Sequence, residues 1–69
     1  MTAPPATVSR AIDSALRLIE REASLRDAAR SEELIPGPDH QQEAARLFRR
    51  ASAVRRQRMA LLERCGLTR

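Results

Sequence analysis

The segment Pro36-Gly37-Pro38 lies near the middle of the 69-residue chain and restricts its fold more than any other feature. Proline lacks the amide proton that a helix needs, and it disfavours helical geometry in the residue before it. Glycine between two prolines permits a sharp change of chain direction. We therefore expect one helix to end by about Ile35 and the chain to reverse over residues 34–38.

The segment before this turn has the apolar spacing of an amphipathic helix. Side chains that recur every three or four residues share one side of a helix with 3.6 residues per turn. This apolar stripe contains Val8, Ile12, Ala15, Leu16, Ile19 and Ala23. Because Thr7 is a suitable N-cap, we expect a flexible lead over residues 1–6 and a helix over about 7–33.

The stripe is interrupted after Ala23, because Arg26 and Arg30 take the positions where the next apolar residues belong. Either the helix bends around its neighbour there, or its last two turns project past the packed region. The sequence leaves both alternatives open.

The segment after the turn predicts a second helix over about 39–65. Asp39 and Gln42 have the spacing of a capping box at its start, and Gly66 suits a left-handed C-cap at its end. Two helices joined by a short turn form an antiparallel hairpin, so we expect an all-α fold. The second apolar stripe contains Ala44, Leu47, Phe48, Ala51, Val54, Met59, Leu61, Leu62 and Cys65.

A chain this short has difficulty in stabilising a core alone, so it needs a disulfide, a metal or association. One cysteine, Cys65, forms no internal disulfide, and His40 alone cannot complete a zinc site with it. The apolar arc of each helix also spans about half of the circumference, which is wider than one facing helix covers. We therefore expect a protein partner or a second copy of the chain to complete the hairpin.

Arg55 and Arg58 interrupt the apolar arc of the second helix. An unpaired buried charge is costly, so either these side chains extend to water or a carboxylate of a partner meets them. Phe48 is the first choice for an interface anchor, because aromatic and arginine residues dominate binding energy. The candidate partner-binding residues are Ile12, Leu16, Ile19, Phe48, Val54, Arg55, Arg58, Met59 and Leu62.

Positive charge is concentrated in the second half of the chain. All 13 basic residues are arginine, and residues 39–69 hold eight of them against three acids. A basic helix face can neutralise phosphates, although helix-turn-helix spacing and an RNA-stacking aromatic set are both missing. Nucleic-acid binding is therefore the alternative function. Its candidate contacts are Arg46, Arg49, Arg50, Arg56 and Arg64.

We expect neither catalysis nor a cofactor or metal. Asp39, His40 and Glu43 lie close together, but a hairpin offers no pocket in which they could act on a substrate. The chain has no positively charged leader followed by an apolar run, and no stretch of about 20 apolar residues. We therefore expect a cytoplasmic protein in which Cys65 is a small buried apolar residue.

Thr7-Val8 leads into Ile12 and Leu16, and a short reversal precedes the second helix. There, Leu47-Phe48-Arg49-Arg50-Ala51-Ser52 is followed by Met59-Ala60-Leu61-Leu62. In this pattern the chain resembles the small co-chaperones of type III secretion needle subunits, which are helical hairpins. The resemblance implies a cytoplasmic protein that pairs with a tetratricopeptide-like chaperone and keeps a needle subunit monomeric before export.

Overall fold

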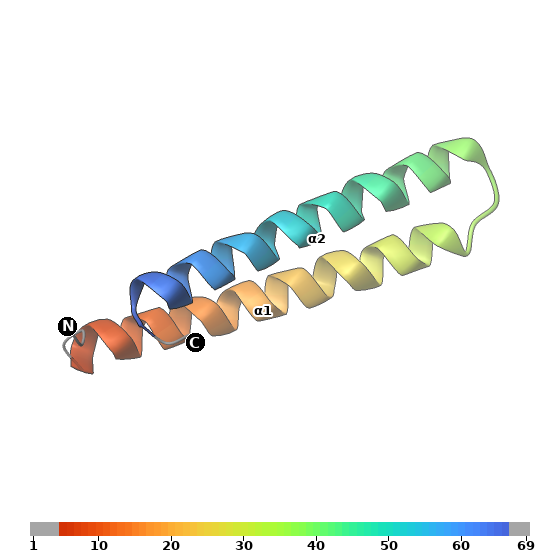
Figure 1. The fold of residues 1–69 in the computed structure, drawn as a ribbon. Helices are drawn as coiled ribbons and strands as arrows, with labels where there is room; N and C mark the ends of the chain where they lie inside the picture. The colour runs from red at the N-terminus through yellow and green to blue at the C-terminus, as the bar shows by residue number, and fades with distance from the viewer. Residues whose placement is uncertain (1–4, 67–69) are drawn as a thin grey trace.

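The structure, a computed structural model, describes residues 5–66 and consists of two long helices. Helix α1 spans Pro5–Glu33 and helix α2 spans Pro38–Arg64, with residues 34–37 between them. The helices lie side by side and run in opposite directions (Figure 1), forming a rod of 51 × 15 × 14 Å. The predicted all-α antiparallel hairpin is confirmed.

Helix α1 begins earlier in the chain than the sequence predicted. Pro5 and Ala6 are already helical, and residues 1–4 of the expected lead lie outside the described residues. At its other end, the amides of Leu34 and Ile35 donate to the carbonyls of Ser31 and Glu32, at 3.3 and 3.1 Å. These bonds to the third residue back tighten the last turn and satisfy carbonyls that the end of a helix leaves without partners.

The reversal depends on Gly37, which has φ 133° and ψ 148°. A residue with a Cβ rarely adopts this conformation. Pro38 follows as the first residue of α2, where its missing amide proton and fixed φ are compatible with a helix. The predicted capping box is wrong, because Gly37 is the N-cap and no side chain caps this end. Asp39 instead lies within the first turn, where its negative charge interacts favourably with the positive end of the helix dipole.

The predicted left-handed residue at the end of α2 is confirmed. Gly66 has φ 69°, and its amide donates to the carbonyl of Glu63 at 3.0 Å. The amide of Cys65 donates to Leu61 at 3.2 Å. A glycine two residues past the end of α2 can therefore turn the chain without steric cost.

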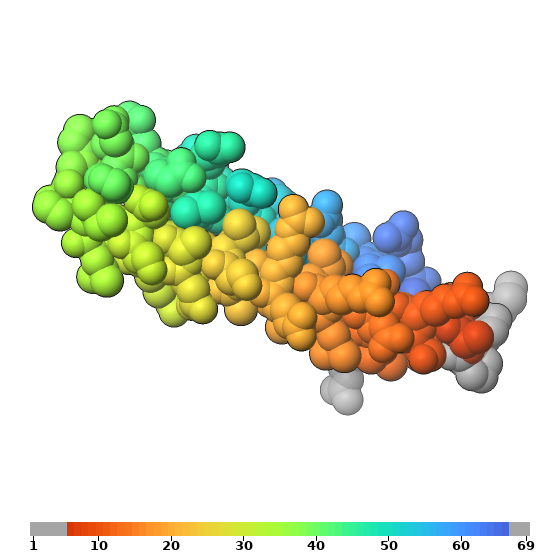
Figure 2. All heavy atoms as spheres, turned by 180° about the vertical axis from the view of Figure 1, so that it is seen from behind, coloured from red at the N-terminus to blue at the C-terminus, as the bar shows by residue number. Residues whose placement is uncertain are grey.

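The side chains buried between the two helices are small. The buried residues are Ala11, Ala15, Ala29, Ala44, Ala51 and Val54. Alanine lets two helix backbones approach closely, but each buried methyl contributes only about 0.8 kcal/mol. Viewed from behind, side chains of α1 and α2 meet along the rod (Figure 2). The helices therefore form a continuous but weakly stabilising contact, which we call the seam.

The seam has a seven-residue period on both helices, with alternating steps of three and four residues, as in packed helix pairs. On α1 the buried and half-buried seam positions are Val8, Ala11, Ala15, Leu18, Glu22, Leu25, Ala29 and Glu32. On α2 they are His40, Ala44, Leu47, Ala51, Val54, Arg58, Leu61 and Cys65.

This period corrects the expectation of a single apolar stripe on α1. Ala15 lies in the seam, whereas Ile12, Leu16 and Ile19 of the same stripe are exposed. The interruption after Ala23 does not end the contact between the helices either, because Ala29 has 0% exposure. The alternative in which the last turns of α1 project past the packed region is therefore excluded.

We expect Gly37→Ala to lower the free energy of unfolding by about 1–3 kcal/mol, because φ of +133° strains an L residue. Crowding would not explain the loss, since an added Cβ meets its nearest atom, Cδ2 of His40, at an ordinary 3.8 Å. Urea denaturation followed by circular dichroism measures the effect. D-alanine at the same position, introduced by chemical synthesis, should remove the strain, and equal stability of all three chains would contradict this account.

Candidate partner-binding face

Large apolar side chains lie on the outside of the hairpin. Ile12, Leu16 and Ile19 are 45%, 53% and 44% exposed, and Met59 of α2 is 42% exposed. The three residues of α1 are separated by steps of four and three, so they share one side of that helix. The hairpin thus buries alanine and leaves larger side chains of its apolar stripes in contact with water.

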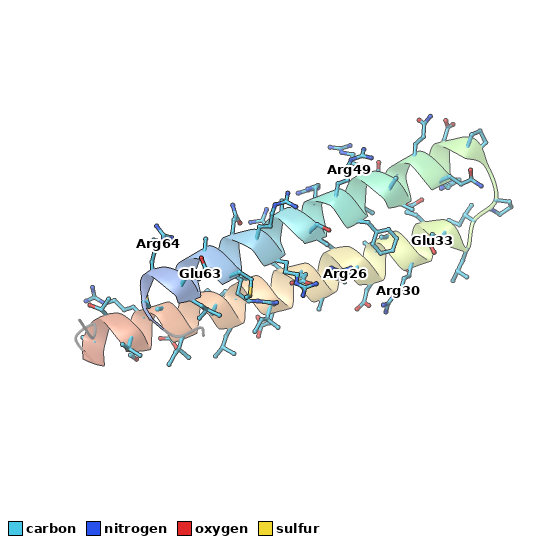
Figure 3. The ribbon with its side chains drawn as sticks, viewed as in Figure 1. Arg26, Arg30, Glu33, Arg49, Glu63 and Arg64 are labelled. Carbon is cyan, nitrogen blue, oxygen red and sulfur yellow. The ribbon has the colours of Figure 1, made fainter. Side chains whose placement is uncertain are left out.

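The exposed large apolar residues of the two helices share one side of the rod. On the opposite side, Arg21 of α1 and Arg50 of α2 line a common hollow. Ile12 and Ile19 lie on the flank of α1 that carries Arg26, which Figure 3 shows between the helices on the side facing the viewer. The corresponding flank of α2, away from Arg50, carries residues separated by seven, four and three positions. They are Phe48, Arg55, Met59 and Leu62.

We call this surface the apolar face. It comprises Ile12, Leu16, Ile19, Phe48, Met59 and Leu62, with Arg55 among them. Phe48 and Leu62 are half-buried at its inner edge, whereas Arg55 is exposed. Val54, also a candidate contact, is 5% exposed between the helices, so its side chain contributes to the seam and not to this surface.

Arg58 has its ionic partner inside the chain. Its Nη1 donates to Oε1 of Glu22 at 3.1 Å, and Nε of Arg26 donates to Oε2 of the same carboxylate at 3.0 Å. The side chains of Glu22 and Arg58 are only 13% and 20% exposed. The carboxylate that Arg58 requires therefore comes from α1, which is neither of the two explanations considered from the sequence.

A second polar contact joins the helices near the turn. Nδ1 of His40 and Oε2 of Glu32 are 2.6 Å apart, in a hydrogen bond between two half-buried side chains. His40 thus connects the start of α2 to the end of α1. Over residues 5–66, no group of three or more histidine, cysteine or acidic side chains is arranged to hold a metal ion.

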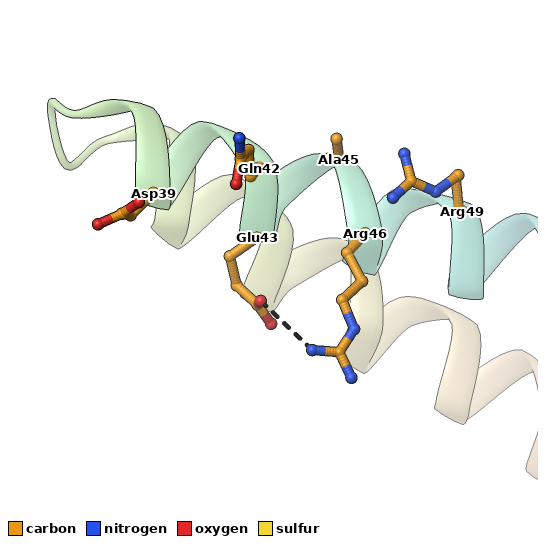
Figure 4. Close-up of a pocket in the computed structure, with 6 residues that line it drawn as sticks. All are labelled: Asp39, Gln42, Glu43, Ala45, Arg46 and Arg49. Atoms are coloured by element: carbon orange, nitrogen blue, oxygen red, sulfur yellow. Dashed lines mark ion pairs between the residues drawn. The ribbon is translucent and has the colours of Figure 1, made fainter.

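The five candidate phosphate contacts are all exposed: Arg46, Arg49, Arg50, Arg56 and Arg64. Arg49 and Arg64 point away from α1 (Figure 3). A surface hollow lined by Asp39, Gln42, Glu43, Ala45, Arg46 and Arg49 comes from α2 alone (Figure 4). Within it, Glu43 and Arg46 form an ion pair at 3.7 Å. It is an open strip of one helix surface, and no side chain of α1 contributes to it.

Sequence reasoning missed Glu22 and Glu32 as structural residues. Both occupy seam positions of the seven-residue period, a signal that was present in the sequence. The apolar stripe of α1 obscured it, because Ile12, Leu16 and Ile19 are more hydrophobic than the alanines buried in the seam. A search for small residues at this period would have found the packed face.

No protein family model, curated protein or solved structure matches this chain. Among the described residues, neither helix combines the length and the apolar character needed to cross a membrane.

We expect Glu22→Ala to lower the free energy of unfolding by about 2 kcal/mol, because two arginines lose their charged acceptor in a largely buried position. Urea denaturation measures the change. Glu20→Ala removes the same type of side chain at an exposed position of the same helix. Its free energy of unfolding should stay within about 0.5 kcal/mol of the wild-type value. Equal losses in the two variants would show that the network does not stabilise the hairpin.

Proposed function

We propose that this protein is a non-enzymatic interaction module, such as an adaptor, co-chaperone or assembly subunit, that buries its apolar face against a helical partner. The observation that carries the proposal is the exposure of Ile12, Leu16 and Ile19 beside a seam whose buried residues are five alanines and Val54. In a hairpin that folds without a partner, we expect aliphatic side chains of this size to be buried between the helices. Their position outside it supports a role in binding.

The energetics support the same conclusion. Burying the exposed half of each large side chain contributes about 1 kcal/mol, since full burial contributes about 1.5–3 kcal/mol. With Met59, the four exposed side chains of the face together contribute about as much as the buried alanine methyls of the seam. The chain also exposes 5453 Å², whereas a compact monomer of 7.7 kDa exposes about 4,300 Å². A partner would therefore add substantially to the stability of the folded state.

The shape and chemistry of the apolar face indicate what the partner presents. Two parallel apolar rows, one on each helix, suit a groove or helix with its own apolar stripe. Arg55 is exposed within the face and calls for a carboxylate on the partner. A larger chaperone with a concave helical surface fits this description and agrees with the resemblance to secretion co-chaperones. A four-helix assembly of two copies is the second candidate. A cytoplasmic location stays a prediction.

Leu16→Glu should abolish partner binding while leaving the hairpin folded, because Leu16 is 53% exposed and does not lie in the seam. Phe48→Glu should have the same effect on binding, but Phe48 is half-buried, so Leu16 gives the cleaner test. Co-purification from native cells with quantitative mass spectrometry, together with light scattering of the purified chain, measures hetero- and self-association respectively.

Ser24→Glu is the matched control, since it adds the same charge at an exposed position of α1 away from the apolar face. It should retain the complexes that the wild type forms. If Leu16→Glu remains folded and keeps every wild-type partner and the wild-type molar mass, the apolar face is not the binding surface.

A further inference from the structure

The side of the rod opposite the apolar face carries arginines of both helices. A hollow there is lined by Arg21 and Leu25 of α1 and by Arg50, Ala53, Val54 and Gln57 of α2. None of these six residues is acidic, and the two arginines come from different helices. The sequence alone placed candidate phosphate contacts on the second helix only. The fold adds Arg21 to them.

Helical spacing extends this surface beyond the hollow. On α1, Arg10 and Arg17 precede Arg21 by eleven and four residues, so they lie on the same side. On α2, Arg46 and Arg64 are four residues before and fourteen after Arg50, again on one side. We call this surface the arginine face; it lies on the side of the rod that is turned toward the viewer in Figure 2. Its members are Arg10, Arg17, Arg21, Arg46, Arg50 and Arg64.

The charges of the arginine face are largely uncompensated within the described part of the chain. Among residues 5–66, the ion pair between Arg46 and Glu43, at 3.7 Å, is the one that involves this face. By contrast, Arg26 and Arg58 share the carboxylate of Glu22 in the seam. Acids thus neutralise arginines where the helices pack, and leave most of those on the arginine face available to an external anion.

We propose that the arginine face binds the phosphate backbone of duplex nucleic acid without reading its sequence. Guanidinium groups match phosphate oxygens in geometry and remain charged at any relevant pH. Arg46 and Arg64 are separated by about 27 Å along α2, from the rise of 1.5 Å per residue. This is most of one duplex turn of about 34 Å, so several phosphates lie within reach of one rod.

The composition of the two faces favours a duplex over other polyanions. Single-stranded nucleic acid is held largely by stacking on aromatic rings, and the single aromatic residue, Phe48, lies at the apolar face. A membrane surface requires apolar anchors beside the positive charges. The exposed Ile12, Leu16 and Ile19 lie on the other side of the rod, and the exposed Leu34 and Ile35 lie in the turn at its end, outside the row of arginines. A partner on the apolar face would leave the arginine face open, so this proposal is independent of the proposed function.

Fluorescence anisotropy of the full chain with two labelled 20-base-pair DNA duplexes of unrelated sequence tests the proposal. We expect equal affinity for both duplexes and, if about four phosphates are neutralised, a loss of about 100-fold in affinity between 50 and 200 mM salt. Arg21→Glu and Arg50→Glu should each weaken binding about tenfold at low salt. Each should also reduce the slope of log affinity against log salt by about one.

Arg30→Glu is the matched control, because it makes the same charge change at an exposed position of α1 outside the arginine face. Its affinity for the duplex should stay within about threefold of the wild-type affinity, because salt screens the exposed charge at position 30 from a distant phosphate. Circular dichroism checks that each variant is folded, and Arg21→Gln and Arg50→Gln replace any variant that is not.

Three outcomes would overturn the proposal. One is absence of duplex binding at 50 mM salt. Another is equal weakening by Arg30→Glu, which would indicate attraction by net charge alone. The third is binding to vesicles of anionic and neutral phospholipid that depends on Arg21 and Arg50 while the duplex stays unbound, which would identify a membrane-surface site instead.

Discussion

The close packing of two helices through alanine is the contact on which the rest of this structure depends. Alanines such as Ala29 and Ala51, both with 0% exposure, let the helices lie side by side along the rod. Their methyl groups remove little apolar surface from water, so this contact holds the hairpin together with a small margin. It also determines which side chains remain outside. Once the alanine sides of both helices face each other, Ile12, Leu16 and Ile19 can be covered only by another molecule.

Polar contacts supply the specificity that alanine cannot. Alanines at similar positions permit the helices to slide relative to each other, because one methyl group resembles the next. Glu22 opposes such a slip, since its carboxylate accepts hydrogen bonds from Arg26 on its own helix and from Arg58 on the other. Glu32 and His40 add a second fixed contact near the turn. A shift of one helix along the other would separate each acid from its partner and leave polar groups unpaired between the helices. The observed register is therefore favoured over shifted registers.

The seam also divides the surface of the rod into two chemically different sides. Ile12, Leu16, Ile19 and Met59 are exposed on one side, and Arg21 and Arg50 line a hollow on the other. Neither side is evident from one helix alone, because each is built from the flanks of two segments that run in opposite directions. This separation allows the two proposed interactions, with a helical protein and with a phosphate backbone, to occur without competing for the same residues.

The sequence by itself determined the turn, the helical class and the approximate helix ends, because these depend on local restrictions. Pro36, Gly37 and Pro38 act through their own backbone geometry, and Gly66 ends α2 in the same way. The tertiary structure decided which side of each helix is buried, since apolar spacing on α1 fits both the Ala15 side and the Leu16 side. It also decided that Arg58 donates a hydrogen bond to Glu22, 36 residues away, and that Arg21 and Arg50 line the same hollow. Such pairings depend on the register between two helices, and no local pattern in either helix specifies that register.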